Sequence, residues 1–313
     1  MNEQEALAVM TSPNKRRRCW GEGILQILIT RNCENACFGC TQGCNVISNQ
    51  STMSVDEFEQ AVLSLKDYFG IVGVFGGNPC LHPNFDEICS ILRKHIPFER
   101  RGIWTNRLAG KGKIVRETFN PEFSNVNVHL NQANYAEFCK EWPEIVNAIK
   151  GVKEDSRHVP PFVAMQDLIE DESERWELIG GCDVNKHWSS MICSIPGKGL
   201  RGFFCEIAGA QALLHAHEAD WPDLGFEVKP GWWDHNILDF EGQVKFYCHR
   251  CGIPLRRFGQ LAIRGEFEEV SETHSGVYKS KDKDRVVKVV TKETSNSRQV
   301  DLMIKYIENS SLS

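Results

Sequence analysis

Three closely spaced cysteines are the residues with the clearest chemistry in this sequence. Cys33, Cys37 and Cys40 follow a C-x3-C-x2-C pattern, directly after the apolar run 24–29. Thiolates are soft ligands, and at this spacing they suit an iron–sulfur cluster or zinc. A 4Fe-4S cluster has four irons, so three cysteines leave one iron open to a small molecule.

This cysteine triad resembles the motif of the radical S-adenosylmethionine (radical SAM) enzymes. In that family the open iron chelates the amino and carboxylate groups of S-adenosylmethionine. Reductive cleavage then gives a 5'-deoxyadenosyl radical, which abstracts hydrogen from the substrate. The residue before the third cysteine is usually aromatic, and here Gly39 stands there with Phe38 one place earlier. The resemblance implies a catalytic 4Fe-4S cluster at the triad, with Phe38 near the adenine.

A second motif, Gly76-Gly77-Asn78-Pro79, follows the apolar run 71–75. It resembles the Gly-Gly-Glu-Pro sequence at the end of the second strand in radical SAM enzymes. Glycine lets the backbone approach a ligand closely. The resemblance implies that the cofactor lies against these glycines and that the next polar residue accepts a hydrogen bond from its ammonium group. Asn78 keeps one carbonyl acceptor for this role and lacks the charge of glutamate.

Strand-like and helix-like segments alternate up to about residue 190. Predicted strands cover 23–30, 71–75, 101–104, 126–130 and 162–165, with a sixth near 183–188. Such alternation predicts a parallel α/β sheet whose ligand lies at the carboxyl ends of the strands. The candidate cofactor-binding residues at those ends are Cys33, Asn78, Asn106, Asn131 and Gln132. The resemblance implies an incomplete (β/α)6 TIM-like barrel.

A second group of four cysteines forms two pairs, Cys193 with Cys205 and Cys248 with Cys251. Four thiolates suit zinc or a fully ligated iron–sulfur cluster equally well. The order and the long gap resemble radical SAM enzymes with a short C-terminal twitch domain, such as the dehydrogenase acting on 2-deoxy-scyllo-inosamine. The resemblance therefore implies an auxiliary 4Fe-4S cluster in preference to zinc. The cysteines at 80, 89, 139 and 182 are interpreted as small buried apolar residues.

Composition excludes several classes of protein. The chain has 313 residues, 41% of them hydrophobic and 25% charged, as in ordinary soluble globular proteins. No apolar run approaches the roughly 20 residues that span a bilayer, and no signal peptide opens the chain. We therefore expect a cytoplasmic protein without a membrane partner, whose cysteines are not in disulfides. The net charge of -6 gives no general attraction to nucleic acid.

Four parts are expected along the chain. Residues 1–20, which include the basic block 15–18, are predicted to be a flexible arm, and residues 21–190 the core barrel. Residues 191–270 are predicted to form a small α+β domain of the twitch or SPASM type. Residues 271–313 are predicted to be a tail without chemistry, apart from one strand-like run at 286–290.

Three function hypotheses follow from these patterns. The first is a radical SAM enzyme that oxidises or rearranges a small polar substrate (a sugar, aminocyclitol or nucleotide-like compound), with an auxiliary cluster and a flavodoxin- or ferredoxin-type electron donor. The second is a radical SAM isomerase, epimerase or decarboxylase acting on a modified nucleoside or nucleic-acid base, which the basic block 15–18 would contact. The third is a non-catalytic zinc or iron–sulfur protein, which would not cleave S-adenosylmethionine.

Overall fold

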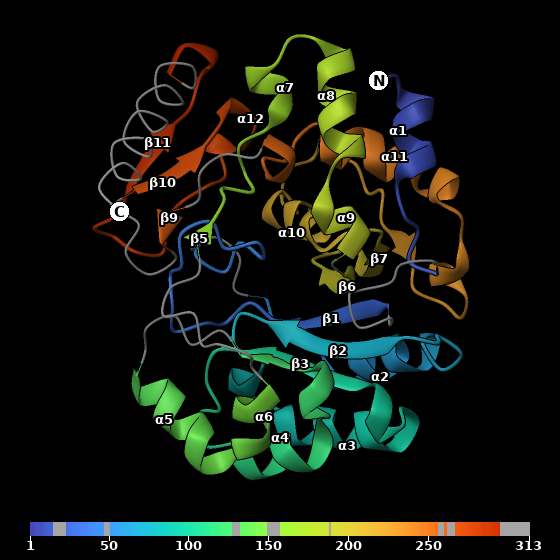
Figure 1. Cartoon of the computed structure of the whole chain (residues 1–313), viewed down its shortest axis with the longest axis vertical. Coiled ribbons are helices and arrows are strands. Elements are labelled where there is room, and N and C mark those ends of the chain that lie inside the picture. The colour runs from blue at the N-terminus through green and yellow to red at the C-terminus, as the bar shows by residue number, and fades with distance from the viewer. Residues whose placement is uncertain are drawn as a thin grey trace.

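One seven-stranded sheet organises the computed structural model (Figure 1). The structure describes residues 1–14, 23–46, 51–126, 132–148, 157–187, 189–255, 260–261 and 267–294. The sheet has the order β4-β3-β2-β1-β6-β7-β8. Its strands are β1 Ile24–Thr30, β2 Ile71–Gly76, β3 Arg101–Thr105, β4 Asn125–Val126, β6 Ser190–Ile195, β7 Gly199–Phe203 and β8 Phe226–Glu227.

The centre of this sheet is parallel, and its far edge is antiparallel. β1 pairs in parallel with both β2 and β6, and β2, β3 and β4 continue the parallel arrangement. β7 and β8 are antiparallel to their neighbours. All seven residues of β1 are buried, as expected for a strand covered on both faces. Because β1, β2 and β3 are parallel, their carboxyl ends meet at one edge of the sheet.

Five helices cover one face of the sheet, below it in Figure 1. They are α2 Val55–Ser64, α3 Phe85–His95, α4 Gly112–Thr118, α5 Gln132–Glu141 and α6 Pro143–Ala148. The sequence signal for the first of them is confirmed: Ser54 and Glu57 form a reciprocal capping box at the start of α2. Phe58, Ala61 and Val62 of α2 are buried.

The opposite face is covered by segments from both ends of the chain. They include α1 Glu3–Val9, α7 Met165–Leu168, α8 Glu172–Gly180, α9 Asp183–His187, α10 Glu206–Leu214, α11 Glu241–Gln243 and α12 Glu272–Ser275. Two small sheets accompany them, β5 Arg157–His158 with β9 Gln260–Leu261 and β10 Phe267–Val270 with β11 Val286–Val289. A π-helix, Val244–Cys248, ends at the first cysteine of the second pair. Within the described part of the chain, no helix combines the length and apolar character needed to cross a membrane.

The predicted α/β class with a parallel central sheet is confirmed, with corrections to single elements. The predicted strand at 162–165 is a turn leading into α7, and the one near 183–188 is α9 as far as residue 187. Instead, β6 takes the place beside β1, so the expected boundary at residue 190 does not separate two sheets. The strand-like run at 286–290 is confirmed as β11.

The N-terminal segment also differs from the prediction. Residues 3–9 form α1 with a capping box at Asn2, and Ala6 and Leu7 are buried. The helix packs against α8, and the terminal amine donates to Ser173 at 3.2 Å. The expected flexible arm is therefore wrong for residues 1–14, whereas the basic block 15–18 lies outside the described residues.

Candidate functional site

The cysteine triad lies on a loop that is fixed at its start by the end of β2. Gly77 N donates to Thr30 O at 2.9 Å, and Asn78 N donates to Asn32 O at 2.7 Å. A Cβ added at Gly77 would lie 2.8 Å from Cys33 Cβ. Gly77 is therefore required for close packing against the cysteine loop, which is a different reason from the approach to a cofactor that the sequence suggests.

The three thiols line one cavity of about 380 Å³ together with the ends of two neighbouring strands. A cavity of this size is typical of small-molecule sites. The sequence-predicted residues that line it are Cys33, Cys37, Cys40, Gly76, Gly77 and Asn106. Gln26, Trp104, His158 and Glu206 line it as well, and sequence reasoning did not identify them.

Two amide side chains present free acceptors to this cavity. Asn106 Nδ2 donates to Cys33 Sγ at 3.8 Å, while its Oδ1 is buried and has no hydrogen-bond partner among the described residues. Gln26 Oε1, in the middle of β1, is likewise buried without a described partner. An unsatisfied buried acceptor costs about 1–3 kcal/mol, so both atoms favour an occupant that donates hydrogen bonds.

The only carboxylate among the described cavity-lining residues belongs to Glu206, in the first turn of α10. Glu206 is 4% exposed, and its Oε2 accepts a hydrogen bond from Ser189 Oγ at 2.5 Å. A buried carboxylate held in this way suits a substrate group that is positively charged or donates hydrogen bonds.

The triad thiols differ in acidity because their surroundings differ. Burial raises the pKa of Cys33 to about 11 and raises that of Cys37 well above its usual range. The pKa of Cys40 is lowered to about 7, chiefly by a hydrogen bond from Cys44. Metal ligation requires deprotonated thiols, so cluster binding here would release protons.

Asn78 does not reach the cavity and serves as an internal hydrogen-bond hub. It is 0% exposed, and its Oδ1 accepts from Cys80 N at 3.1 Å and from Thr105 Oγ1 at 3.0 Å. Its Nδ2 donates to both carboxylate oxygens of Glu34 at 3.2 Å. The predicted contact of Asn78 with a cofactor ammonium group is therefore corrected, since both ends of its amide are already bonded. The carboxylate beside this motif comes from Glu34, within the cysteine loop.

Phe38 is likewise displaced from its predicted role. Its side chain is 0% exposed and does not line the cavity. The neighbouring Gly39 has φ +57°, and a Cβ there would lie 2.6 Å from Val159 O, so an aromatic residue does not fit at this position. Pro79 is buried in a 3-10 turn outside the cavity wall. Gln132 is the first residue of α5, whereas Asn131 lies outside the described residues.

A second cavity collects four cysteines, but the set differs from the predicted one. It is lined by Cys182, Cys205, Cys248 and Cys251. Besides burial, the charges of the other three thiols raise the pKa of Cys248. Cys193 is 0% exposed within β6 and does not line this cavity. The structure thus places Cys182 beside Cys205, Cys248 and Cys251 and places Cys193 apart from them, whereas metal binding by either set of four stays a prediction.

The two cavities share a wall. Val184 and Ile253 line both of them. Cys205 lines the second cavity, and the next residue, Glu206, lines the first. The two cavities therefore adjoin at Val184, Ile253 and the Cys205–Glu206 segment.

A buried cation without an ion-pair partner among the described residues, Arg31, lies next to the triad loop. Arg31 is 0% exposed, and its Nε and Nη1 have no hydrogen-bond partner within the described ranges. Its Nη2 donates to Gly43 O at 2.5 Å, and its backbone N donates to Ser51 O at 2.9 Å. A buried cation of this kind is costly unless an anion compensates it. Among the described residues, no three or more His, Cys, Asp or Glu side chains are arranged to hold a metal ion.

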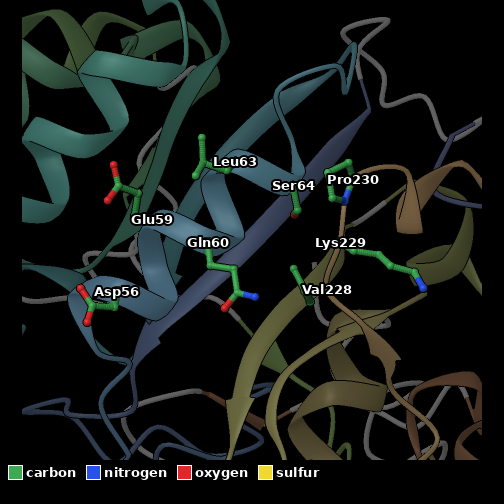
Figure 2. Close-up of a pocket in the computed structure, with 8 residues that line it drawn as sticks. All are labelled: Asp56, Glu59, Gln60, Leu63, Ser64, Val228, Lys229 and Pro230. Atoms are coloured by element: carbon green, nitrogen blue, oxygen red, sulfur yellow. The ribbon is translucent and has the colours of Figure 1, made fainter.

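A third cavity, of about 360 Å³, lies on the outside of α2 and contains none of the predicted residues. Figure 2 shows α2 on one side and residues 228–230 on the other. Glu59 on this surface pairs with Lys94 at 3.2 Å and with His95 at 3.1 Å. The carboxylate of Glu59 is thus already paired with exposed basic side chains. This third cavity therefore adds nothing to the chemistry of the thiol sites.

Comparison with known proteins finds a likeness to solved structures alone. No family model and no curated protein match the chain. BtrN in complex with AdoMet and 2-DOIA matches at 13% identity, over 72% of this chain and 87% of that one, with a TM-score of 0.41. Streptococcus suis SuiB bound to S-adenosylmethionine matches at 18% identity, over 33% of this chain and 24% of that one, with a TM-score of 0.27. SuiB bound to its precursor peptide SuiA gives 11% identity, 74% and 70% coverage, and a TM-score of 0.33.

SuiB and BtrN are radical SAM enzymes, the family that the cysteine motif resembles. This chain spans 24% of the first SuiB chain, and all three TM-scores are low. The likenesses therefore carry no argument about its substrate or reaction, which must be argued from its own residues.

Proposed function

We propose that this chain is a radical SAM enzyme in which Cys33, Cys37 and Cys40 hold the catalytic 4Fe-4S cluster. The observation that supports this most strongly is their position on one cavity, together with the glycine-rich end of β2 and Asn106 at the end of β3. When bound, the cluster and S-adenosylmethionine supply a 5'-deoxyadenosyl radical by one-electron cleavage.

The chain's own groups bind and orient in this proposal. Asn106 donates from Nδ2 to Cys33 Sγ and keeps Oδ1 free to accept from the ammonium group of S-adenosylmethionine. Gly76 and Gly77 form a wall without side chains beside that group. The buried Arg31 compensates negative charge at the triad.

We propose that Cys182, Cys205, Cys248 and Cys251 hold an auxiliary 4Fe-4S cluster, with zinc as the alternative. Its support is the four-thiol cavity and the wall that this cavity shares with the polar one. A substrate in the triad-lined cavity would give one hydrogen atom to the deoxyadenosyl radical that the bound cofactors supply. An auxiliary cluster would supply the acceptor for one further electron, and one proton would pass to solvent. The sum is a two-electron oxidation. With zinc, the same substrate radical would lead to a redox-neutral rearrangement or epimerisation.

The polar wall favours a small substrate that carries an amine or several hydroxyl groups. Glu206 and Gln26 both offer acceptors, and Trp104 adds an aromatic surface. An aminocyclitol matches these groups better than a phosphorylated nucleotide, because the described cavity-lining residues include the Glu206 carboxyl group and no lysine or arginine. The electron donor, the cytoplasmic location and a nucleic-acid role for residues 15–18 remain predictions.

Glu206→Gln is expected to raise the KM for an aminocyclitol about 10- to 100-fold, because a charge-assisted hydrogen bond is lost. The assay is anaerobic and follows dithionite-driven 5'-deoxyadenosine and oxidised product, with 2-deoxy-scyllo-inosamine as the probe. Glu241→Gln, an exposed carboxylate paired with Lys245, is the matched control and should behave like wild type. An unchanged KM in Glu206→Gln would refute the assigned substrate contact, and no deoxyadenosine from the wild type would refute the proposed enzyme.

A further inference from the structure

The segment predicted to be an inert tail packs directly on the cysteine loop. Val46 forms a bridge with Ser280, and Lys281 N donates to Asn45 O at 2.6 Å. The side chain of Lys281 donates to Cys33 O, and that of Arg285 donates to Ala36 O. Residues 267–290 thus contact the loop at both of its ends and in its middle.

Glu268 connects this segment to the loop through a buried ion pair. It is 1% exposed, and its Oε1 pairs with Arg285 Nη1 at 2.7 Å. Its Oε2 accepts from Gly39 N at 3.3 Å, and its Oε1 accepts from Asn45 Nδ2 at 3.0 Å. A buried pair with so many satisfied bonds fixes geometry strongly.

Three cations surround the triad as a result, and we call Arg31, Lys281 and Arg285 the basic collar. Each donates to the backbone of the cysteine loop, Arg31 to Gly43 O, Lys281 to Cys33 O and Arg285 to Ala36 O. Arg285 Nε, like two nitrogens of Arg31, is buried without a partner in the described part of the chain. Two carboxylates, Glu268 at 2.7 Å and Asp282 at 3.5 Å, both pair with Arg285 and neutralise part of this positive charge.

We propose that the basic collar positions the triad loop and stabilises the negative charge of its cluster, so that Lys281 and Arg285 set the reduction potential at which the site accepts an electron. A 4Fe-4S cluster held by three thiolates is anionic and gains one further negative charge on reduction. Nearby cations stabilise the reduced form more than the oxidised form, which raises the potential. The inference rests on the proposed function, because it requires a cluster at the triad.

The test uses the full-length, reconstituted protein with Lys281→Met and Arg285→Met. Both changes remove a charge and keep a long side chain. The potential is followed by electron paramagnetic resonance, on the signal that changes when S-adenosylmethionine is added. A chelator challenge gives the rate of iron release. We expect a more negative potential in both variants and iron release at least about tenfold faster, as for other partners of metal ligands.

Two further variants separate charge from packing. Arg285→Lys should retain most of the wild-type potential, and Lys283→Met, an exposed lysine in the same segment, should match wild type in both measurements. Faster iron loss with an unchanged potential would show that the segment only braces the loop, and would overturn the proposal. A wild-type chain that binds no cluster at the triad would overturn the proposed function and this inference together. If all the proteins bind that cluster but the reduction potentials of the Lys281→Met and Arg285→Met variants equal that of the wild type, this inference alone is overturned.

Discussion

Cys182→Ser is expected to abolish metal binding at the second site, whereas Cys193→Ser is expected to leave it intact. Cys182 lines the cavity with Cys205, Cys248 and Cys251, and Cys193 lies within the core strand β6. Removal of one thiolate from a closed set of four leaves the metal incompletely ligated. With two clusters bound, the wild type should hold about eight irons per chain and Cys182→Ser about four.

The two serine variants control for each other, because both replace one thiol by a hydroxyl. Iron, sulfide and zinc are counted after anaerobic reconstitution, and the melting temperature is recorded beside them. Cys193→Ser should keep its metal while losing about 1–3 kcal/mol of stability, since a hydroxyl is placed in an apolar core. Metal loss in Cys193→Ser with retention in Cys182→Ser would restore the ligand set predicted from the sequence and contradict the one assigned from the structure.

Asn78→Glu is expected to destabilise the protein by about 3 kcal/mol at neutral pH. This is expected although the substitution restores the glutamate of the Gly-Gly-Glu-Pro sequence that the motif resembles. The Asn78 amide donates to Glu34 in a fully buried position, so glutamate would set two carboxylates against each other. Their repulsion and burial raise the pKa of one carboxyl in the folded state. The penalty therefore applies above that raised pKa and fades as the pH falls through it, when the group becomes protonated.

The companion variant is Asn78→Glu with Glu34→Gln, which returns the pair to a single charge and should recover most of the lost stability. Asn84→Glu, at the exposed start of α3, is the matched control and should change stability by less than about 0.5 kcal/mol. Urea unfolding between about pH 5 and pH 8 measures all four proteins. If Asn78→Glu were as stable as wild type at pH 8, the hydrogen-bonded hub described for Asn78 would be incorrect.

The parts of the molecule that the sequence predicts well are those with local signals. The triad, the strand before it and the capping box of α2 each depend on residues close together in the chain. Asn106 lines the same cavity as the triad because it follows a strand, and parallel strands bring their carboxyl ends together. Its predicted contact with a cofactor stays a prediction.

The errors arise where contacts are long-range. The spacing of the cysteines groups Cys193 with Cys205, whereas the β6–β7 hairpin places Cys193 in the core and Cys182 lines the cavity with Cys205. The roles of Glu34, Glu206 and Arg285 depend on partners far away in the chain, such as Asn78 and Glu268. The sequence gives a partial signal for Arg285, because a segment of mixed acidic and basic residues beside a strand-like run is unusual for a tail. The contact of Arg285 with the cysteine loop, however, follows only from the fold.

The most direct test of the central claim is 5'-deoxyadenosine formation from S-adenosylmethionine by the reconstituted protein under anaerobic conditions with dithionite. The account predicts that the wild type and Cys193→Ser form deoxyadenosine. It also predicts that a Cys33→Ala, Cys37→Ala, Cys40→Ala triple variant forms none while retaining the metal of the four-thiol site. No deoxyadenosine from an iron-loaded wild type, or equal amounts from the triple variant, would contradict the account.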